Sequence, residues 1–160
     1  MTLNEFFSLV PKAAVAFSGG TDSAFLLWAA RECGCEVRAY YGKTAFQPQF
    51  ELEDARRLCA QLGVELTVVE LDVLQIPGVA ENPPDRCYHC KTALFSRLRQ
   101  AAREDGYTVL LDGTNASDDA GDRPGMRALR ELEVRSPLRE CGLTKDEVRR
   151  RSREAGLFTW

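Results

Sequence analysis

Residues 13–23 read Ala-Ala-Val-Ala-Phe-Ser-Gly-Gly-Thr-Asp-Ser, a short apolar run that leads directly into a polar turn containing two glycines. The run is free of helix breakers, and residues 24–30 after the turn are rich in helix formers. The pattern predicts a buried strand over 15–17 and a helix over 21–33, joined by a tight turn. The first amides of such a helix lack partners within it, and the positive end of the helix dipole lies behind them. This stretch is therefore typical of an anion-binding site.

The side chains of the turn make the expected anion more specific. Ser18, Thr21 and Ser23 add hydroxyl donors, and the two glycines let the backbone approach a ligand closely. Asp22 would repel a bare phosphate, so it predicts a metal ion between its carboxylate and the phosphate oxygens. The expected pyrophosphate cradle consists of Ser18, Gly19, Gly20, Thr21, Asp22 and Ser23.

Two common nucleotide-binding motifs are excluded. No lysine follows Gly20, as a Walker-type phosphate loop requires, and the glycines lack the Gly-x-Gly-x-x-Gly spacing of dinucleotide-binding folds. The alternative is a Gly-Gly turn capped by Ser or Asp that binds no ligand. Strand, glycines, hydroxyls, carboxylate and helix occur in the order that a phosphate site needs, which favours the functional interpretation.

Composition and charge are those of an ordinary globular chain of one-domain length. The 160 residues are 44% hydrophobic and 28% charged, and the formal net charge of -3 gives no general indication of nucleic-acid binding. Residues 123–154 carry ten Lys and Arg against six Asp and Glu, which fits either a solvated helix face or a surface for phosphate groups. No signal peptide or membrane-spanning run is recognisable, so the six cysteines predict free thiols in a reducing cytoplasm.

Strand-like and helix-like stretches alternate along the chain. Strands are expected at 15–17, 36–41, 64–71 and 108–111, with a short fifth strand from 134 to 137, and helices at 21–33, 50–62, 87–104 and 144–155. This alternation predicts an α/β fold with a mostly parallel five-stranded sheet and helices on both faces. Ligands of such sheets bind beyond the carboxyl ends of the strands. The loops at 18–23, 42–49 and 112–123 should therefore meet at one edge.

The loop after the fourth strand adds polar groups at that edge. Gly113 allows a ligand to lie against the backbone, and Thr114 and Asn115 can hydrogen-bond a nucleotide or an acyl group. Asp118, together with Asp22, is a candidate ligand for magnesium. The alternative is an Asx-rich turn that leads into a helix.

Two arginines follow this loop and are candidate catalytic residues. Arg123 and Arg127, presented beside a phosphate loop, can neutralise charge that develops during nucleotidyl transfer. The alternative is that both are surface charges on a helix.

A Cys-x-x-Cys pair begins the longest predicted helix. Cys87 and Cys90 enclose His89, the only histidine of the chain, and Lys91 follows. One such pair is a weak signal for a structural zinc site, which usually needs a second pair or two histidines. Three interpretations stay open: an inert helix start, a redox or sulfur-carrying pair, or two ligands of an iron–sulfur cluster.

Taken together, these motifs resemble the PP-loop ATP pyrophosphatases, and within them the ATP-dependent sacrificial sulfur transferases of the LarE family. The first matching stretch, 14–23, is shared by the whole superfamily. The other matching stretches are more specific to the sulfur transferases, and they lie at 82–91, 112–115, 123–127 and 136–149. The resemblance runs the length of the chain and implies an adenine nucleotide alpha hydrolase-like, Rossmann-like fold of three α/β/α layers.

The resemblance also implies a reaction. ATP with Mg²⁺ would lie at residues 18–23, and a carboxylate of a pyridinium dicarboxylate mononucleotide would attack its α-phosphate and release pyrophosphate. Asp22, Arg123 and Arg127 would be the catalytic residues, while residues 18–23 and 113–115 would bind the nucleotide. Sulfur would then come from a sacrificed cysteine or through an iron–sulfur cluster, as a step toward a nickel-pincer nucleotide cofactor.

The resemblance further implies a domain organisation. Residues 1–160 would form the ATP-binding domain alone, without the C-terminal domain of the family, whose full-length members assemble as homo-oligomers. Two alternatives are another PP-loop enzyme, for tRNA thiolation or amide formation, and a nucleotide-binding module that acts with a partner chain. Neither a membrane nor a nucleic acid is expected as a partner under the first interpretation.

Overall fold

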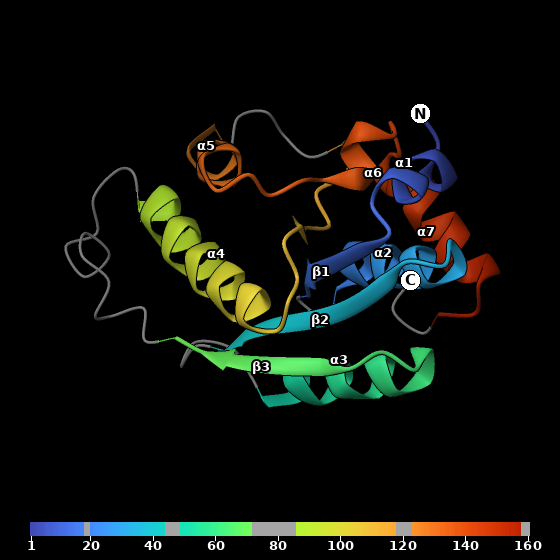
Figure 1. The fold of residues 1–160 in the computed structure, drawn as a ribbon. Helices are drawn as coiled ribbons and strands as arrows, with labels where there is room; N and C mark the ends of the chain where they lie inside the picture. Colours follow the sequence, from blue (N-terminus) through green and yellow to red (C-terminus); the bar gives the residue numbers. More distant parts are fainter. Residues whose placement is uncertain (18–19, 44–48, 72–85, 118–122, 158–160) are drawn as a thin grey trace.

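The computed structural model describes residues 1–17, 20–43, 49–71, 86–117 and 123–157, excluding the side chains of 86–91 and 123–126 (Figure 1). Its described strands form one parallel sheet in the order β3-β2-β1-β4. These strands are β1 (Lys12–Ala16), β2 (Glu36–Lys43), β3 (Leu66–Glu70) and β4 (Leu110–Leu111). The central strand β1 therefore has β2 on one side and β4 on the other.

Helices cover both faces of the sheet (Figure 1). The described helices are α1 (Leu3–Leu9), α2 (Thr21–Glu32), α3 (Gln49–Leu62), α4 (Arg86–Glu104), α5 (Arg123–Glu131), α6 (Pro137–Glu140) and α7 (Lys145–Glu154). One core cluster joins the sheet to α1, α2, α3, α6 and α7, and a second joins it to α4 and α5. The arrangement confirms the predicted three-layer α/β/α fold.

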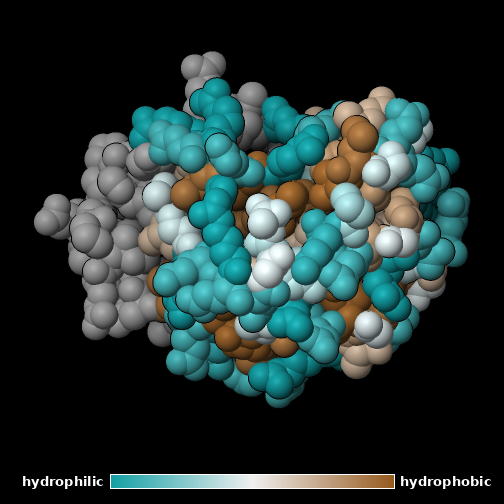
Figure 2. All heavy atoms as spheres, in the orientation of Figure 1, coloured by the Kyte–Doolittle hydropathy of each residue, from teal (hydrophilic) through white to brown (hydrophobic). Residues whose placement is uncertain are grey.

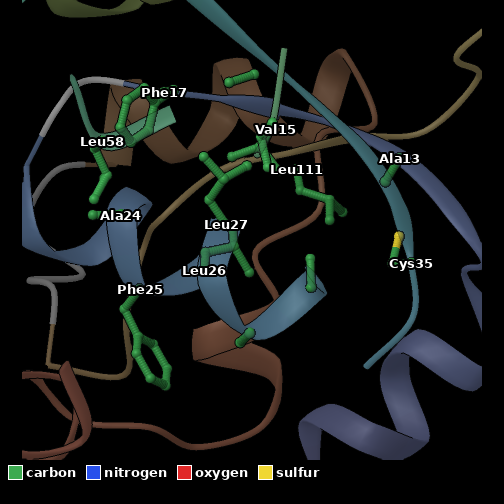
Figure 3. Packing of buried hydrophobic residues seen from close by; sticks show 14 of the residues in the cluster. Ala13, Val15, Phe17, Ala24, Phe25, Leu26, Leu27, Cys35, Leu58 and Leu111 are labelled. Carbon is green, nitrogen blue, oxygen red and sulfur yellow. The ribbon is translucent and has the colours of Figure 1, made fainter. Parts of the chain in front are cut away.

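Alternation along the strands explains the two clusters. Ala13 and Val15 of β1 belong to the cluster with α2, whereas Ala14 between them belongs to the cluster with α4. Successive side chains of a strand point to opposite faces, so a strand buried on both faces is apolar at every position. Figure 3 shows Val15, Leu27 and Leu111 packed together in the first cluster.

The prediction of a fifth strand was wrong, because the described sheet has four strands. Arg135 forms only an isolated parallel bridge with Leu111, in which the Arg135 amide bonds to Leu110 and the Asp112 amide bonds to Arg135. Glu133, with a φ of 57°, ends the turn after α5, and Pro137 begins α6. Only three residues are left between these two boundaries, too few for a strand ladder.

A side-chain cap marks the start of the last helix. The Thr144 hydroxyl accepts a hydrogen bond from the Glu147 amide at 3.3 Å, so α7 begins at the following residue, Lys145. Three helices, α1, α5 and α6, were not among the predicted helices. Two of them, α1 and α6, span fewer than eight residues and depend on tertiary packing for their stability.

The surface of the described residues is largely polar. The face seen in Figure 2 is mostly hydrophilic, with smaller hydrophobic patches between the hydrophilic residues. The large apolar side chains that are exposed in the described part of the chain are Met1, Leu9 and Phe50. None of the helices described is both long and apolar enough to cross a membrane.

Candidate functional site

The site lies where the order of the strands reverses. From β1 the chain builds outward through β2 to β3, and then crosses back through α4 to place β4 on the other side of β1. The loops that leave β1 and β4 therefore diverge and open a crevice at the carboxyl edge of the sheet. The expected meeting of these two loops is confirmed, while the middle of the loop after β2, residues 44–48, lies outside the described residues.

Gly113 shows how closely the two loops approach. A Cβ atom at Gly113 would lie 2.9 Å from the Ser23 backbone nitrogen and 3.1 Å from its Cα. Real side chains do not tolerate such distances to backbone atoms, so the contact requires glycine. The loop itself is fixed by backbone bonds, because the Ala116 amide bonds to Leu143 at 2.8 Å.

A cavity of about 330 Å³ opens at this junction. Its wall includes residues 20–23 at the start of α2, residues 112–114 after β4, and Lys145 from α7. The positive end of the α2 dipole thus lies at the cavity wall, next to a lysine. A phosphate group is the ligand that this combination favours.

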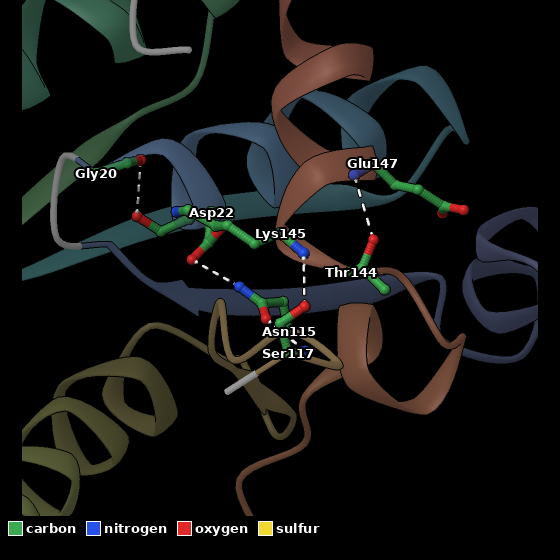
Figure 4. A network of polar contacts seen from close by, with 8 residues as sticks. Gly20, Asp22, Asn115, Ser117, Thr144, Lys145 and Glu147 are labelled. Carbon is green, nitrogen blue, oxygen red and sulfur yellow. Dashed lines mark hydrogen bonds and ion pairs between the residues drawn. The ribbon is translucent and has the colours of Figure 1, made fainter. Parts of the chain in front are cut away.

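Asp22 links the three elements that form the cavity (Figure 4). Its Oδ1 lies 3.0 Å from Lys145 Nζ, and its Oδ2 accepts a hydrogen bond from Asn115 Nδ2 at 3.1 Å. Asn115 is only 1% exposed, and its Oδ1 accepts the Ser117 amide at 2.8 Å. The Ser117 hydroxyl in turn accepts the Lys145 amide at 3.1 Å. The carboxylate is therefore held in place by α7 and by the loop after β4.

A second carboxylate, Asp112, organises the opposite wall. It lies at the end of β4, is 7% exposed, and accepts the hydroxyl of Thr114 at 2.7 Å and that of Ser136 at 2.5 Å. The Thr114 amide also bonds to it, at 3.3 Å. These contacts fix the conformation of the loop at the position where Gly113 meets α2.

Lys145 is the site residue that the sequence predictions missed, although it lies within a stretch that supported the family resemblance. Its position in the first turn of α7 contradicts the usual preference, because a cation near a helix N-terminus faces the positive end of the dipole. A lysine directly after a capping threonine was therefore a signal in the sequence that an anion lies nearby. In the structure that anion is Asp22.

The other predicted residues divide into three groups. Residues that line the cavity are Gly20, Thr21, Asp22, Ser23, Gly113 and Thr114, and Asn115 lies directly behind Asp22. Residues outside the described part of the chain are Ser18, Gly19 and Asp118, and the side chains of Arg123, Cys87 and Cys90 are also outside it. Arg127 does not line the cavity, and its Nε lies 3.6 Å from Glu131 on the exposed side of α5.

Two larger cavities in the described part of the chain lie elsewhere. One, of about 510 Å³, is enclosed by α1, α2 and α7, and the other, of about 760 Å³, lies between α4 and the end of α5. Neither contains residues from the carboxyl ends of the strands. Chemistry and topology, rather than volume, therefore assign the site to the smaller cavity.

The sequence of the chain is similar to those of several known proteins. Residues 12–81 match the family model of the queuosine biosynthesis protein QueC. The chain is 36% identical to an uncharacterized protein of Synechocystis, over 99% of this chain and 59% of that protein. It is 33% identical to the pyridinium-3,5-bisthiocarboxylic acid mononucleotide synthase of Lactiplantibacillus plantarum, over 93% of this chain and 55% of that enzyme.

Two further proteins are more distant in sequence, and one of them is a solved structure with a similar fold. The tRNA-specific 2-thiouridylase MnmA of Thermotoga maritima is 26% identical, over 91% of this chain and 52% of that enzyme. The glutamine-dependent NAD+ synthetase of Acinetobacter baumannii, solved with ADP, superposes with a TM-score of 0.74 at 21% identity, over 96% of this chain and 31% of that one. The chain spans about half the length of the curated relatives it matches.

Proposed function

Because the chain belongs to the PP-loop ATP pyrophosphatase superfamily, we propose that it binds ATP in the cavity between α2 and the loop after β4 and adenylates a carboxylate. The observation that carries the proposal is the Asp22–Lys145 pair at the N-terminus of α2. It brings a cation and a carboxylate to the helix end where a triphosphate would lie. The 33% identical relative is named for a bisthiocarboxylic acid mononucleotide, so a pyridinium dicarboxylate mononucleotide is the proposed substrate.

The chemistry assigned to the cavity is substitution at the α-phosphate. A carboxylate oxygen of the substrate attacks the α-phosphorus, the bond between that phosphorus and the bridging oxygen breaks, and pyrophosphate leaves. The start of α2 and Lys145 would stabilise the negative charge that builds up on the leaving group. The walls of the cavity would hold both reactants in line, which lowers the entropic part of the barrier.

The donor set of the cavity fits a magnesium ion held jointly with ATP. Mg²⁺ usually binds one or two carboxylates, substrate phosphates and several waters, rather than a closed protein cage. Within the described residues no group of three or more His, Cys, Asp and Glu side chains could form such a cage. Asp22 retains lone pairs beyond those used by Lys145 and Asn115, and it would hold the ion, which would neutralise phosphate charge.

The pKa values of four thiols limit which cysteines of this chain could supply sulfur. Burial raises the pKa of Cys35 to about 11 and that of Cys59 to about 12, and it also raises the pKa values of Cys33 and Cys141. A thiolate is the nucleophilic form, so these four thiols are poor sulfur carriers near neutral pH. Cys87 and Cys90 stay the candidates within this chain, either as sulfur carriers or as ligands of an iron–sulfur cluster.

The decisive measurement is ATP–pyrophosphate exchange. The purified chain is incubated with Mg-ATP, labelled pyrophosphate and either the pyridinium dicarboxylate mononucleotide or tRNA. Incorporation of label into ATP that depends on the mononucleotide is the expected result, because adenylation is reversible while pyrophosphate is present. Exchange that depends on tRNA would instead support the thiouridylase-like alternative, to which the MnmA relatives point. No exchange with intact ATP binding would support a module that needs a partner chain.

A charge-removing variant of Asp22 tests the metal assignment. Asp22→Asn keeps an oxygen acceptor for Asn115 but removes the charge that would hold Mg²⁺, so we expect at least about tenfold weaker Mg-ATP binding, a loss of roughly 1.4 kcal/mol. Calorimetric titration with ATP, once in the presence of Mg²⁺ and once in the presence of EDTA, provides the readout. The matched control, Asp146→Asn on the exposed side of the first turn of α7, should bind like the wild type. An Asp22→Asn variant that binds Mg-ATP normally would refute the assignment.

A further inference from the structure

The structure contains a buried carboxylate that the proposed chemistry does not use. Asp112 lies in the cavity wall, is 7% exposed, and receives three hydrogen bonds. Its Oδ1 accepts the Ser136 hydroxyl at 2.5 Å and the Thr114 amide at 3.3 Å, and its Oδ2 accepts the Thr114 hydroxyl at 2.7 Å. Three converging donors are the surroundings of an ionised carboxylate, which can only accept hydrogen bonds.

These bonds determine what Thr114 can offer to a ligand. A hydroxyl has one hydrogen to donate and two lone pairs that accept. Because the hydrogen of Thr114 is directed to Asp112, its oxygen can only accept on the side that lines the cavity. The group that meets Thr114 is therefore an O–H or N–H donor or a metal ion, and an unprotonated phosphate oxygen is excluded.

The position of Thr114 indicates which donor of ATP this would be. The donors of ATP are the ribose hydroxyls and the 6-amino group of the base. Gly113, the residue before Thr114, lies against the backbone of Ser23 at the start of α2, where the phosphates are expected. The ribose is bonded directly to the α-phosphate, whereas the amino group lies at the far end of the nucleotide. The negative charge of Asp112 also disfavours a phosphate group at this wall.

We propose that Asp112 is a positioning residue, which fixes Thr114 as the acceptor for a ribose hydroxyl of ATP. The inference rests on the proposed function, since it requires ATP in this cavity. It assigns recognition of the sugar to the loop after β4 and phosphate binding to α2 and α7.

The first test compares nucleotides in calorimetric titrations of the wild type, Thr114→Val and Thr114→Ser. The ligands are ATP, 2′-deoxy-ATP, 3′-deoxy-ATP and inosine triphosphate, which lacks the 6-amino group. We expect the wild type to bind one of the two deoxy analogues about fivefold more weakly than ATP, the size of one neutral hydrogen bond. Thr114→Val should bind ATP about fivefold more weakly and lose that discrimination, while Thr114→Ser, which keeps the hydroxyl, should retain it.

The second test reverses the polarity of Thr114 through Asp112→Asn. Two donors meet at Oδ1 and only one at Oδ2, so the amide oxygen of asparagine takes the first position and its NH₂ group faces Thr114. The Thr114 hydroxyl then accepts from residue 112 and turns its hydrogen toward the ligand. Discrimination against the deoxy analogue should disappear in Asp112→Asn. Ser136→Ala, which leaves the Thr114 bond intact, is the matched control and should retain it.

The outcomes separate this inference from the proposed function. Discrimination that is unchanged in Thr114→Val would overturn the role of Thr114 while ATP binding stands. Loss of discrimination against inosine triphosphate alone would also overturn it, by assigning Thr114 to the base. A wild type that binds no ATP would overturn both proposals. If Asp112→Asn fails to fold, the comparison of Thr114→Val with Thr114→Ser still decides whether Thr114 accepts a hydrogen bond from the ribose.

Discussion

Lys145→Met is expected to lower the rate of ATP–pyrophosphate exchange by at least about a hundredfold, the usual effect of losing one preorganised group that stabilises transition-state charge. The methionine keeps the unbranched apolar stem, one atom shorter, but removes the only cation that the structure places in the described cavity wall. It also leaves the Asp22 carboxylate, whose side chain is 22% exposed, without its ion-pair partner. Both effects act on the charge of the leaving pyrophosphate, so the exchange rate should fall more than the affinity for ATP.

The control for this experiment lies one turn further along the same helix. Arg149 is exposed on α7 and does not line the cavity, so Arg149→Met removes one positive charge from the same helix without touching the site. Its exchange rate should stay within about twofold of the wild type, since the interactions of an exposed charge are weak. Equal losses in both variants would show that the net charge of α7 matters rather than Lys145 itself.

Gly113→Ala is expected to abolish detectable ATP binding while leaving the domain folded. The added Cβ would lie 2.9 Å from the Ser23 nitrogen and 3.2 Å from the Asp22 carbonyl carbon. These are backbone atoms at the first turn of α2, so they cannot be relieved by rotation of a side chain. The turn must move away from the loop after β4, and the phosphate site moves with it. Titration with Mg-ATP measures the loss, and circular dichroism checks that the fold is retained.

A second glycine provides the comparison. Gly142 has a φ of 72° but no atom within 4 Å of an added Cβ, so Gly142→Ala strains the backbone without displacing a neighbour. Gly142→Ala should lower the melting temperature and leave ATP affinity close to that of the wild type. Normal ATP binding by Gly113→Ala would contradict the site geometry described for the two loops.

The fold could be predicted because its signals are local. A short apolar run, a Gly-Gly turn and a helix-forming run are contiguous over residues 13–30, and the same alternation recurs to β4. Burial on both faces makes β1 apolar at the consecutive positions Ala13, Ala14 and Val15, a pattern that is typical of a parallel sheet. The fifth strand was wrong because Val134 and its neighbours have strand-like character, and only the boundaries at Glu133 and Pro137 reduce them to one bridge.

The site could be predicted only in part because its partners are distant in sequence. The polar side chains after β1 and β4 could be identified from their residue types and from their positions after predicted strands. Those within the described residues lie together as expected. The pairing of Asp22 with Lys145 depends on where α7 packs against α2, which no local pattern specifies. Arg127 shows the opposite case. Its residue type and position suited a catalytic role, but in the structure it lies beside Glu131 and does not line the cavity.

The Asp22 network joins residues separated by 93 positions along the chain in one contact and by 123 in the other. Such contacts form only after nearly the whole domain has folded, because closing such long loops costs conformational entropy. ATP should therefore protect the domain against global unfolding as well as against local opening near residues 20–23. In hydrogen exchange, bound nucleotide would then slow the most protected amides of β1 and β2, far from the ligand, by the factor 1 + [ATP]/Kd.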